Sequence, residues 1–253
     1  LLPDFSKVTE SGFSEVIFAA MGQAFFTLSL GIGSMEIFGS YIDKKHSLTG
    51  EAVRVIGLDT FVALCSGLII FPACFAYDVD VTSGGSLIFL TLPNIFNNLP
   101  GGQFWGSLFF VFMTFAALST VLAVFENIVS CVTELTGWER KKCCLICCAG
   151  IFLLSLPCVL GFNLWSEVRL IAGRDVLDSE DFLVSNLLLP LGSLSMILFC
   201  VTRYGWGWDN FLKEANEGKG LQVAKWLRPY MTYVLPVIVF VIFAVGIYNF
   251  FAG

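Results

Sequence analysis

Charged residues are scarce in this sequence. Only 13% of its 253 residues are Asp, Glu, Lys or Arg, whereas 57% are hydrophobic. A soluble domain usually carries about 25% charged residues, so this composition excludes a surface that faces only water. The few basic residues form no patch interleaved with aromatics, which argues against binding to nucleic acid.

Histidine is almost absent as well. The single histidine, His46, lies outside the long apolar runs. No histidine is therefore available at membrane depth to pair with a serine, and no pair of histidines can hold a zinc ion. These absences argue against an intramembrane hydrolase, and we predict that the protein is not an enzyme.

The start of the chain lacks the features of a signal peptide. Residues 1–12 have neither a cationic start nor an apolar stretch of their own. The chain begins Leu-Leu-Pro instead of Met, and we therefore expect it to be a fragment of a longer protein.

Long apolar runs dominate what is present. A membrane-spanning helix needs roughly 20 apolar residues, and continuous runs of this length satisfy their backbone in lipid as helices. We therefore predict an all-α polytopic membrane protein, with residues 1–253 as a single transmembrane domain. The predicted spans are 16–41, 55–77, 104–134, 141–166, 182–204 and 229–252.

The connections between the spans predict the orientation. Residues 78–103 are too long for a turn and are expected to form an outer hairpin with a helical stretch over 86–98, which contains Pro93. Residues 206–226 mix aromatic and charged residues and are expected at the membrane interface. Of the 14 Lys and Arg, eleven fall in one set of alternate connections and three in the other. Because cytoplasmic loops carry the excess of Lys and Arg, both ends of the chain are predicted to lie outside the plasma (inner) membrane.

Four of the nine cysteines form a cluster near the start of the fourth span. Cys143 and Cys147 share one face of a helix, and Cys144 and Cys148 share the next. One helix cannot direct both pairs at a single tetrahedral metal ion. Packing is therefore favoured over a metal or redox site for this cluster.

The first predicted span contains residues that can interrupt a helix. Within the run 22–34, Gly31 and Gly33 follow Thr27 and Ser29 by about one turn. Unwinding at mid-membrane frees carbonyls to bind ions and is tolerated only where the backbone lines a cavity. The alternative is close helix packing, since glycine is common in transmembrane helices.

Acidic residues inside the spans indicate function. An acid at the centre of a membrane helix costs about 2.5–3.5 kcal/mol on insertion scales. Asp59 lies five residues beyond Arg54, and for this acid we favour a functional role. Glu36 lies close to the basic residues Lys44 and Lys45, and its role stays open.

A stripe of small and hydroxyl residues marks the third span. Ala116, Ser119, Thr120 and Ala123 fall on one helix face. Hydroxyl and carbonyl oxygens suit a hard cation such as Na⁺, although the same stripe can serve helix packing alone. Glu126, about two turns further on, is another acid in this span.

These motifs resemble the neurotransmitter:sodium symporter family. The run 22–33 (GQAFFTLSLGIG) is similar to the sixth transmembrane helix of that family, and 115–124 (FAALSTVLAV) is similar to its eighth. Residues 59–72, Pro93 and 181–192 are similar to its seventh helix, fourth outer loop and tenth helix. The resemblance implies the second inverted repeat of a leucine-transporter-like fold plus one further helix, with a broken first helix.

The resemblance also implies sodium-coupled symport of amino acids or related amines by alternating access, with roles for individual residues. The implied substrate-pocket residues are Phe26, Ser29, Ile32, Thr120 and Val124. The implied Na⁺ ligands are Thr27 and Asp59 at a first site, and Ala116 (through its carbonyl), Ser119 and Thr120 at a second. Asp181 matches an outer-gate acid, Glu134 an inner-gate acid, and Tyr41 a residue that braces the inner gate.

Three positions depart from the family pattern. Asp59 stands where several members have Asn, so chloride is not expected as a cofactor. Ile32 replaces a common Phe, and Asn127 replaces a common Pro. The first repeat is not in this chain, and we expect the missing N-terminal half of the same protein to complete both sodium sites. A channel or a structural membrane subunit without sodium coupling is the alternative function.

Overall fold

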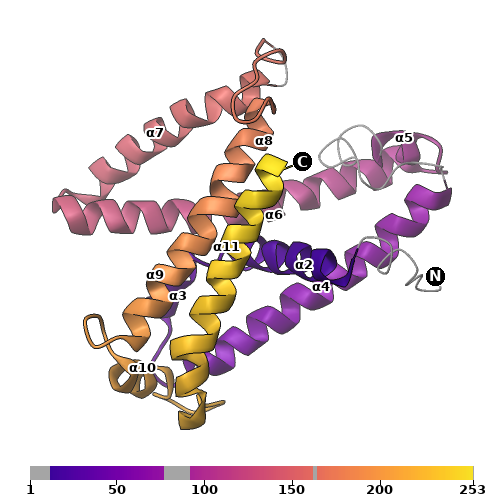
Figure 1. Ribbon diagram of the computed structural model, residues 1–253. Helices are drawn as coiled ribbons and strands as arrows, with labels where there is room; N and C mark the ends of the chain where they lie inside the picture. The colour runs from indigo at the N-terminus through magenta and orange to yellow at the C-terminus, as the bar shows by residue number, and fades with distance from the viewer. Residues whose placement is uncertain (1–11, 77–91, 162–163, 253) are drawn as a thin grey trace. The chain divides into compact units, whose positions relative to one another are not determined.

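The computed structural model describes residues 12–76, 92–161 and 164–252, which are mostly helical. The described residues form two compact units, one within residues 55–123 and the other within residues 12–54 and 124–252. Figure 1 shows the helices, which in chain order are α2 (Phe13–Thr27), α3 (Ser34–Tyr41), α4 (Leu48–Ala76), α5 (Leu92–Asn97), α6 (Gly102–Thr136), α7 (Arg140–Gly161), α8 (Val176–Asp181), η2 (Phe182–Leu188), α9 (Leu189–Val201), α10 (Trp208–Ala215), η3 (Lys225–Leu227), η4 (Tyr230–Val234) and α11 (Leu235–Ala252).

Within the described ranges, five helical stretches are long and apolar enough to cross a membrane, and α2 is a shorter apolar helix. The five stretches are Leu48–Ala76, Gly102–Thr136, Arg140–Gly161, Val176–Val201 and Lys225–Phe251. Each overlaps one of the predicted spans. Their ends differ because hydropathy marks the apolar part of a helix, whereas polar residues can continue the same helix into water.

The start of α4 illustrates this difference. The helix begins at Leu48, seven residues before the predicted apolar span. Its first turns carry Glu51 and Arg54, which form an ion pair at 2.6 Å. Pairs of opposite charge three residues apart support a helix in water, so the helix extends beyond the apolar run.

The connection predicted as an outer hairpin is described only from Leu92 onward. The helical stretch predicted over 86–98 corresponds to α5, Leu92–Asn97, and residues 86–91 lie outside the described residues. Pro93 falls in the first turn of α5, where its missing N–H costs no hydrogen bond. In the unit of residues 55–123, α5 packs on α6 through the rings of Phe96 and Phe109, whose centroids are 5.5 Å apart.

The core of the other unit lies between α2, α9 and α11. Phe25 of α2, Leu189 of α9, and Val239 and Ile242 of α11 form one buried cluster. Figure 1 shows α9 and α11 running side by side, and they share the most extensive contact between elements of this unit. Burial of a large apolar side chain contributes roughly 1.5–3 kcal/mol, so this cluster fixes α2 against the α9–α11 pair.

Both helices of this pair contain a wide π-helical turn just before a proline. The turn η2 precedes Pro190, and η4 precedes Pro236. Proline lacks an N–H, and its ring clashes with the carbonyl four residues earlier. A π-turn accommodates that mismatch. Within η2, the side-chain amide of Asn186 donates to the Gly246 carbonyl of α11 at 3.1 Å, which joins the two helices.

Candidate functional site

The chain is unwound between α2 and α3. The first half-helix ends at Thr27 and the second begins at Ser34. Ser29, Gly31 and Gly33 have φ of 51°, 85° and 90°, in the left-handed region that only glycine adopts without strain. The predicted break of the first span into two half-helices is therefore confirmed.

Gly31 also packs closely against another helix. A Cβ at Gly31 would clash with the Leu189 carbonyl and Ser193 of α9, and a Cβ at Gly192 would clash with the Gly31 carbonyl. Backbone therefore lies directly on backbone at this point. The two functions considered for the glycines, unwinding and close packing, occur together.

Unwinding leaves backbone oxygens without their helical partners. The Leu30 N–H donates to the Phe25 carbonyl at 3.0 Å, and the Ser29 N–H donates to the Phe26 carbonyl at 3.0 Å. The carbonyls of Leu28 and Leu30 accept no backbone N–H from residues 12–76, 92–161 or 164–252, whereas the Gly31 carbonyl is covered by Gly192 of α9. Such oxygens are suitable ligands for a cation or for a polar group of a ligand.

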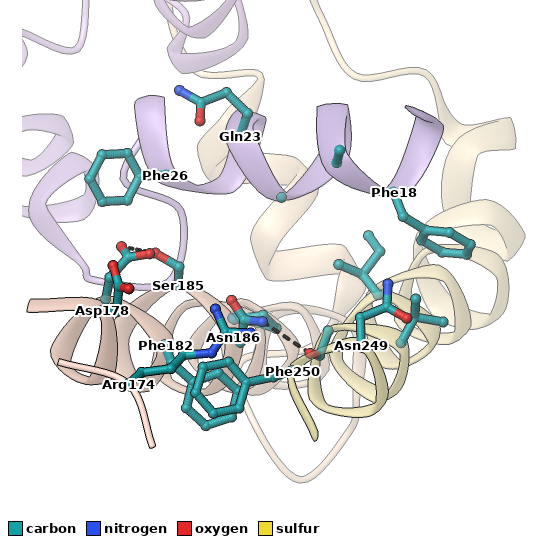
Figure 2. A pocket seen from close by; sticks show the side chains of 17 residues that line it. Phe18, Gln23, Phe26, Arg174, Asp178, Phe182, Ser185, Asn186, Asn249 and Phe250 are labelled. Atoms are coloured by element: carbon teal, nitrogen blue, oxygen red, sulfur yellow. Dashed lines mark hydrogen bonds between the residues drawn. The ribbon is translucent and has the colours of Figure 1, made fainter. Parts of the chain in front are cut away.

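A cavity of about 560 Å³ lies beside the first half-helix, between α2, α8, η2 and α11. Two of the predicted site residues, Phe26 and Asp181, line it together. The Asp181 carboxylate accepts a hydrogen bond from the Ser185 hydroxyl at 2.9 Å. Figure 2 shows the cavity, whose lining residues are Phe18, Ala19, Gly22, Gln23, Phe26, Arg174, Asp178, Asp181, Phe182, Ser185, Asn186, Pro190, Ile242, Val245, Gly246, Asn249 and Phe250.

One wall of this cavity is aromatic and carries a cation. The rings of Phe182 and Phe250 are stacked, with centroids 3.5 Å apart. The Arg174 guanidinium lies 4.5 Å from the centroid of the Phe250 ring, and Figure 2 shows these three side chains together. With the carboxylates of Asp178 and Asp181 nearby, the cavity offers both signs of charge next to an apolar surface.

Two hydroxyls of the small-residue stripe on α6 share one carbonyl. Ser119 Oγ donates to the Ala116 carbonyl at 2.7 Å, and Thr120 Oγ1 donates to the same carbonyl at 3.3 Å. Bonds from Ser and Thr to a carbonyl three or four residues earlier also occur in helices without an ion. The three predicted oxygen ligands are therefore close together, in an arrangement compatible with either role.

The remaining predicted ligand and pocket residues lie on three helices and in the unwound segment. Asp59 is half-buried on α4, Thr27 is the last residue of α2, and Val124 is half-buried on α6. Ile32 lies in the unwound segment and packs against the buried cluster around Phe25 and Leu189. Thr27 and Asp59 belong to different units.

A polar network connects the end of α3 with α6 and α7. The Tyr41 hydroxyl donates to Glu126 Oε1 at 2.7 Å. Arg140 Nη2 lies 2.7 Å from Glu126 Oε1 and 2.6 Å from Oε2, and Ser130 Oγ also donates to this carboxylate at 3.4 Å. The predicted gate residue Glu134 is exposed in the last turn of α6 and has no ion pair within the described part of the chain.

Sequence reasoning did not find Arg140 as a member of this network. In the sequence, Arg140 was only one of the eleven Lys and Arg in one set of connections. Glu126 was noted only as a further acid within the third span. The signal available was their position on either side of a short connection, which brings the end of α6 and the start of α7 together. Their contact with Tyr41, 85 positions from Glu126, could not be read from spacing.

The cysteine cluster and Glu36 take no part in these sites. Cys143 is buried, and its thiol lies 4.0 Å from Thr136 Oγ1 and 3.9 Å from the Trp138 carbonyl. Within the described ranges no group of three or more His, Cys, Asp or Glu is arranged to hold a metal ion. Glu36 lies in the first turn of α3 and its side chain is exposed.

Comparison with known proteins agrees with the motifs. The sequence model of the sodium:neurotransmitter symporter family matches residues 1–252. An uncharacterized sodium-dependent transporter of Haemophilus influenzae is 35% identical over 246 residues, which are 96% of this chain and 52% of that protein. The human sodium- and chloride-dependent neutral and basic amino acid transporter B(0+) is 30% identical over 168 residues, 62% of this chain and 26% of that protein.

A solved structure matches the fold as well. The crystal structure of MhsT in complex with L-phenylalanine superposes with a TM-score of 0.83 at 35% sequence identity, over 96% of this chain and 54% of that one. The predicted all-α, leucine-transporter-like fold class is thereby confirmed. The chain spans about half the length of the H. influenzae relative and of MhsT.

Proposed function

Because the chain belongs to the sodium:neurotransmitter symporter family, we propose that the full-length protein carries out sodium-coupled symport of amino acids or related amines by alternating access. The observation that supports this function best is the unwound segment between α2 and α3, which exposes backbone oxygens where a membrane helix is broken. Irregular backbone is tolerated at membrane depth only where it lines a cavity or a protein interior.

The substrate class follows from two similar proteins. MhsT was solved with L-phenylalanine, and the human relative is named as a transporter of neutral and basic amino acids. The family resemblance assigns the substrate pocket to residues of the unwound segment, of the end of α2 and of α6. The residues assigned to that pocket are Phe26, Ser29, Ile32, Thr120 and Val124.

Two sodium ions would bind with the substrate. Thr27 and Asp59 supply one hydroxyl and one carboxylate to the first site, and the Ala116 carbonyl with Ser119 and Thr120 supplies the second. Oxygen ligands of this kind suit a hard cation. Residues from the corresponding first half of the protein would complete both sites, and chloride would not be required.

Alternating access would use a gate on each side of the membrane. Asp181, at the cavity, serves the outer gate, while Tyr41 and Glu134 serve the inner gate. The bond from Tyr41 to Glu126, and the two contacts of Glu126 with Arg140, extend the inner gate to a residue outside the predicted set.

Replacing Arg140 with Gln is expected to weaken the inner gate. Glu126 would lose its cation and its hold on Tyr41 would loosen, so inward-facing conformations would become more populated. The apparent affinity for external substrate falls with the fraction of protein that faces outward. We expect a higher KM for uptake in Arg140→Gln and an unchanged KM in Lys141→Gln, the neighbouring cation. Equal KM values in both variants would remove Arg140 from the gate.

The protein is proposed to lie in the plasma (inner) membrane with both ends of this chain outside. The larger share of Lys and Arg lies in the connections 42–54, 137–142 and 203–228, which would then face the cytoplasm. The segment 206–226 would lie at the interface, where Trp208 of the short helix α10 is buried against its own unit.

Uptake by the full-length protein in liposomes tests the proposal. With an inward sodium gradient, at least one member of a panel of radiolabelled L-amino acids and related amines is expected to accumulate above its external concentration. Replacing sodium with potassium, or collapsing the gradient, should abolish accumulation. A channel would instead equilibrate its permeant ion without stoichiometric sodium coupling, and a structural subunit would give no flux. Either result would reject the symporter.

A further inference from the structure

The carbonyl of Ile32 has a partner from another helix. In a continuous helix this carbonyl would accept the N–H of Glu36, four residues later. That N–H donates instead to the Gly33 carbonyl, at 3.1 Å. The Ile32 carbonyl accepts a hydrogen bond from the side-chain amide of Asn127 on α6, at 2.9 Å. One side chain therefore replaces a backbone bond that the break removes.

The backbone on both sides of Ile32 lets the chain come close to the Asn127 amide. Gly31 and Gly33, on either side of Ile32, have φ of 85° and 90°. A Cβ at Gly33 would lie 3.5 Å from Asn127 Oδ1, so the backbone approaches the amide closely. Asn127 is only 8% exposed. Loss of its N–H would leave a carbonyl with little access to replacement water, which is the costly case for a hydrogen bond.

Asn127 lies next to the residue that holds the opposite end of α3. Tyr41, the last residue of this half-helix, donates to Glu126 at 2.7 Å. Adjacent residues of α6 therefore hold the eight-residue helix α3 at both ends. On its other side, Ile32 packs against the buried cluster around Phe25 and Leu189. The start of α3 is thus fixed between the core of its unit and α6.

We infer that Asn127 is a positioning residue for the ligand-binding segment at the break. The inference rests on the proposed function and adds a residue that acts through the Ile32 carbonyl. By holding that carbonyl, Asn127 sets where the carbonyl oxygens of Leu28 and Leu30 are presented. When the inner side opens, release of this bond lets the start of α3 leave α6.

A thiol at the start of α3 reports this contact. Ser34 is the first residue of α3 and is only 4% exposed, so a cysteine in its place is shielded while the start of α3 is held. In a full-length background with every native cysteine replaced by Ala, Ser34→Cys would be labelled with a membrane-impermeant maleimide on inside-out vesicles. The variant Asn127→Leu has a side chain of similar size but no N–H to donate. Thr133→Val is the matched control, because the Thr133 hydroxyl donates to the Val129 carbonyl of its own helix, at 2.7 Å.

The expected result is faster labelling and weaker substrate binding in Asn127→Leu alone. A lost bond to a buried carbonyl corresponds to about a tenfold change in the equilibrium. Labelling at position 34 in the Ser34→Cys background should therefore accelerate about tenfold, and KM for the panel compound that wild type takes up fastest should rise about tenfold, by the same reasoning. The maximal rate should change much less than KM, since Asn127 positions the binding segment. Thr133→Val should match wild type in all three measurements.

Labelling and KM values in Asn127→Leu that equal those of Thr133→Val would overturn the inference. Asn127→Ala is judged by the same measurements if the Leu variant does not reach the membrane. The labelling comparison needs no substrate. If wild type shows no sodium-driven uptake, the proposed function fails, while the role of Asn127 in holding α3 is still decided by the thiol.

Discussion

Uptake by the wild-type full-length protein is expected to continue unchanged when chloride is replaced with gluconate, and Asp59→Asn is expected to lose transport or to require chloride. By the family resemblance, Gln23 and Thr27 match residues of the anion pocket of chloride-dependent members, and Asp59 would bring a fixed carboxylate to that pocket. Two negative charges within about 4–6 Å repel each other, and burial strengthens that repulsion. One carboxylate also balances one Na⁺.

The size of the effect should be large. Removing one partner of a buried ion pair costs about 3–5 kcal/mol, which corresponds to a loss of sodium affinity of roughly a hundredfold or more. Glu51→Gln is the control, since Glu51 is an acid of the same helix that pairs with Arg54 at 2.6 Å near its start. This variant should remain indifferent to chloride. Wild-type uptake that stops in gluconate would contradict the assignment of Asp59.

The second large effect is expected from the double variant Ser119→Ala, Thr120→Ala. Both hydroxyls point to the Ala116 carbonyl, at 2.7 and 3.3 Å, so the substitution removes two of three clustered oxygens while packing is largely kept. A lost hydrogen-bond-type contact to a charge is worth about 1.5–3 kcal/mol. The sodium concentration for half-maximal uptake should therefore rise about tenfold or more.

Another threonine of α6 separates this role from packing. Thr114 donates to the Phe110 carbonyl at 2.8 Å, the same kind of bond within the helix, but it lies outside the stripe. Thr114→Ala should leave the sodium dependence of uptake unchanged. If the double variant behaves like Thr114→Ala, then Ser119 and Thr120 serve only the packing and internal bonding of α6.

Much of the fold follows from local properties of the sequence. Apolar runs of about 20 residues become membrane helices because no other open structure satisfies the backbone in lipid. For the break between α2 and α3, the glycines Gly31 and Gly33 left unwinding and close packing both open, and the family resemblance implied the break; their left-handed backbone is what the structure then showed. The pocket and sodium assignments came from the family resemblance of the same segments and remain predictions.

Partners that are distant in sequence were decided only by the tertiary structure. Glu134 was assigned to the inner gate, yet it is Glu126 that contacts Tyr41 and Arg140 in the described part of the chain. Both acids lie on α6, and helical periodicity alone does not determine which of them faces α3. The close contact of Gly31 with Gly192 likewise depends on how α9 packs against the break.

The sequence by itself determined that this chain is a set of membrane helices, that the first is interrupted near Gly31, and to which family it belongs. These properties depend on residues within one segment, where hydropathy and backbone freedom act locally. Only the tertiary structure decided that the side-chain amide of Asn127 donates a hydrogen bond to the Ile32 carbonyl, at 2.9 Å. The departure from the common Pro at that position was visible in the sequence. Its purpose was not, because a broken helix leaves several carbonyls in need of donors, and only packing selects which side chain reaches which one.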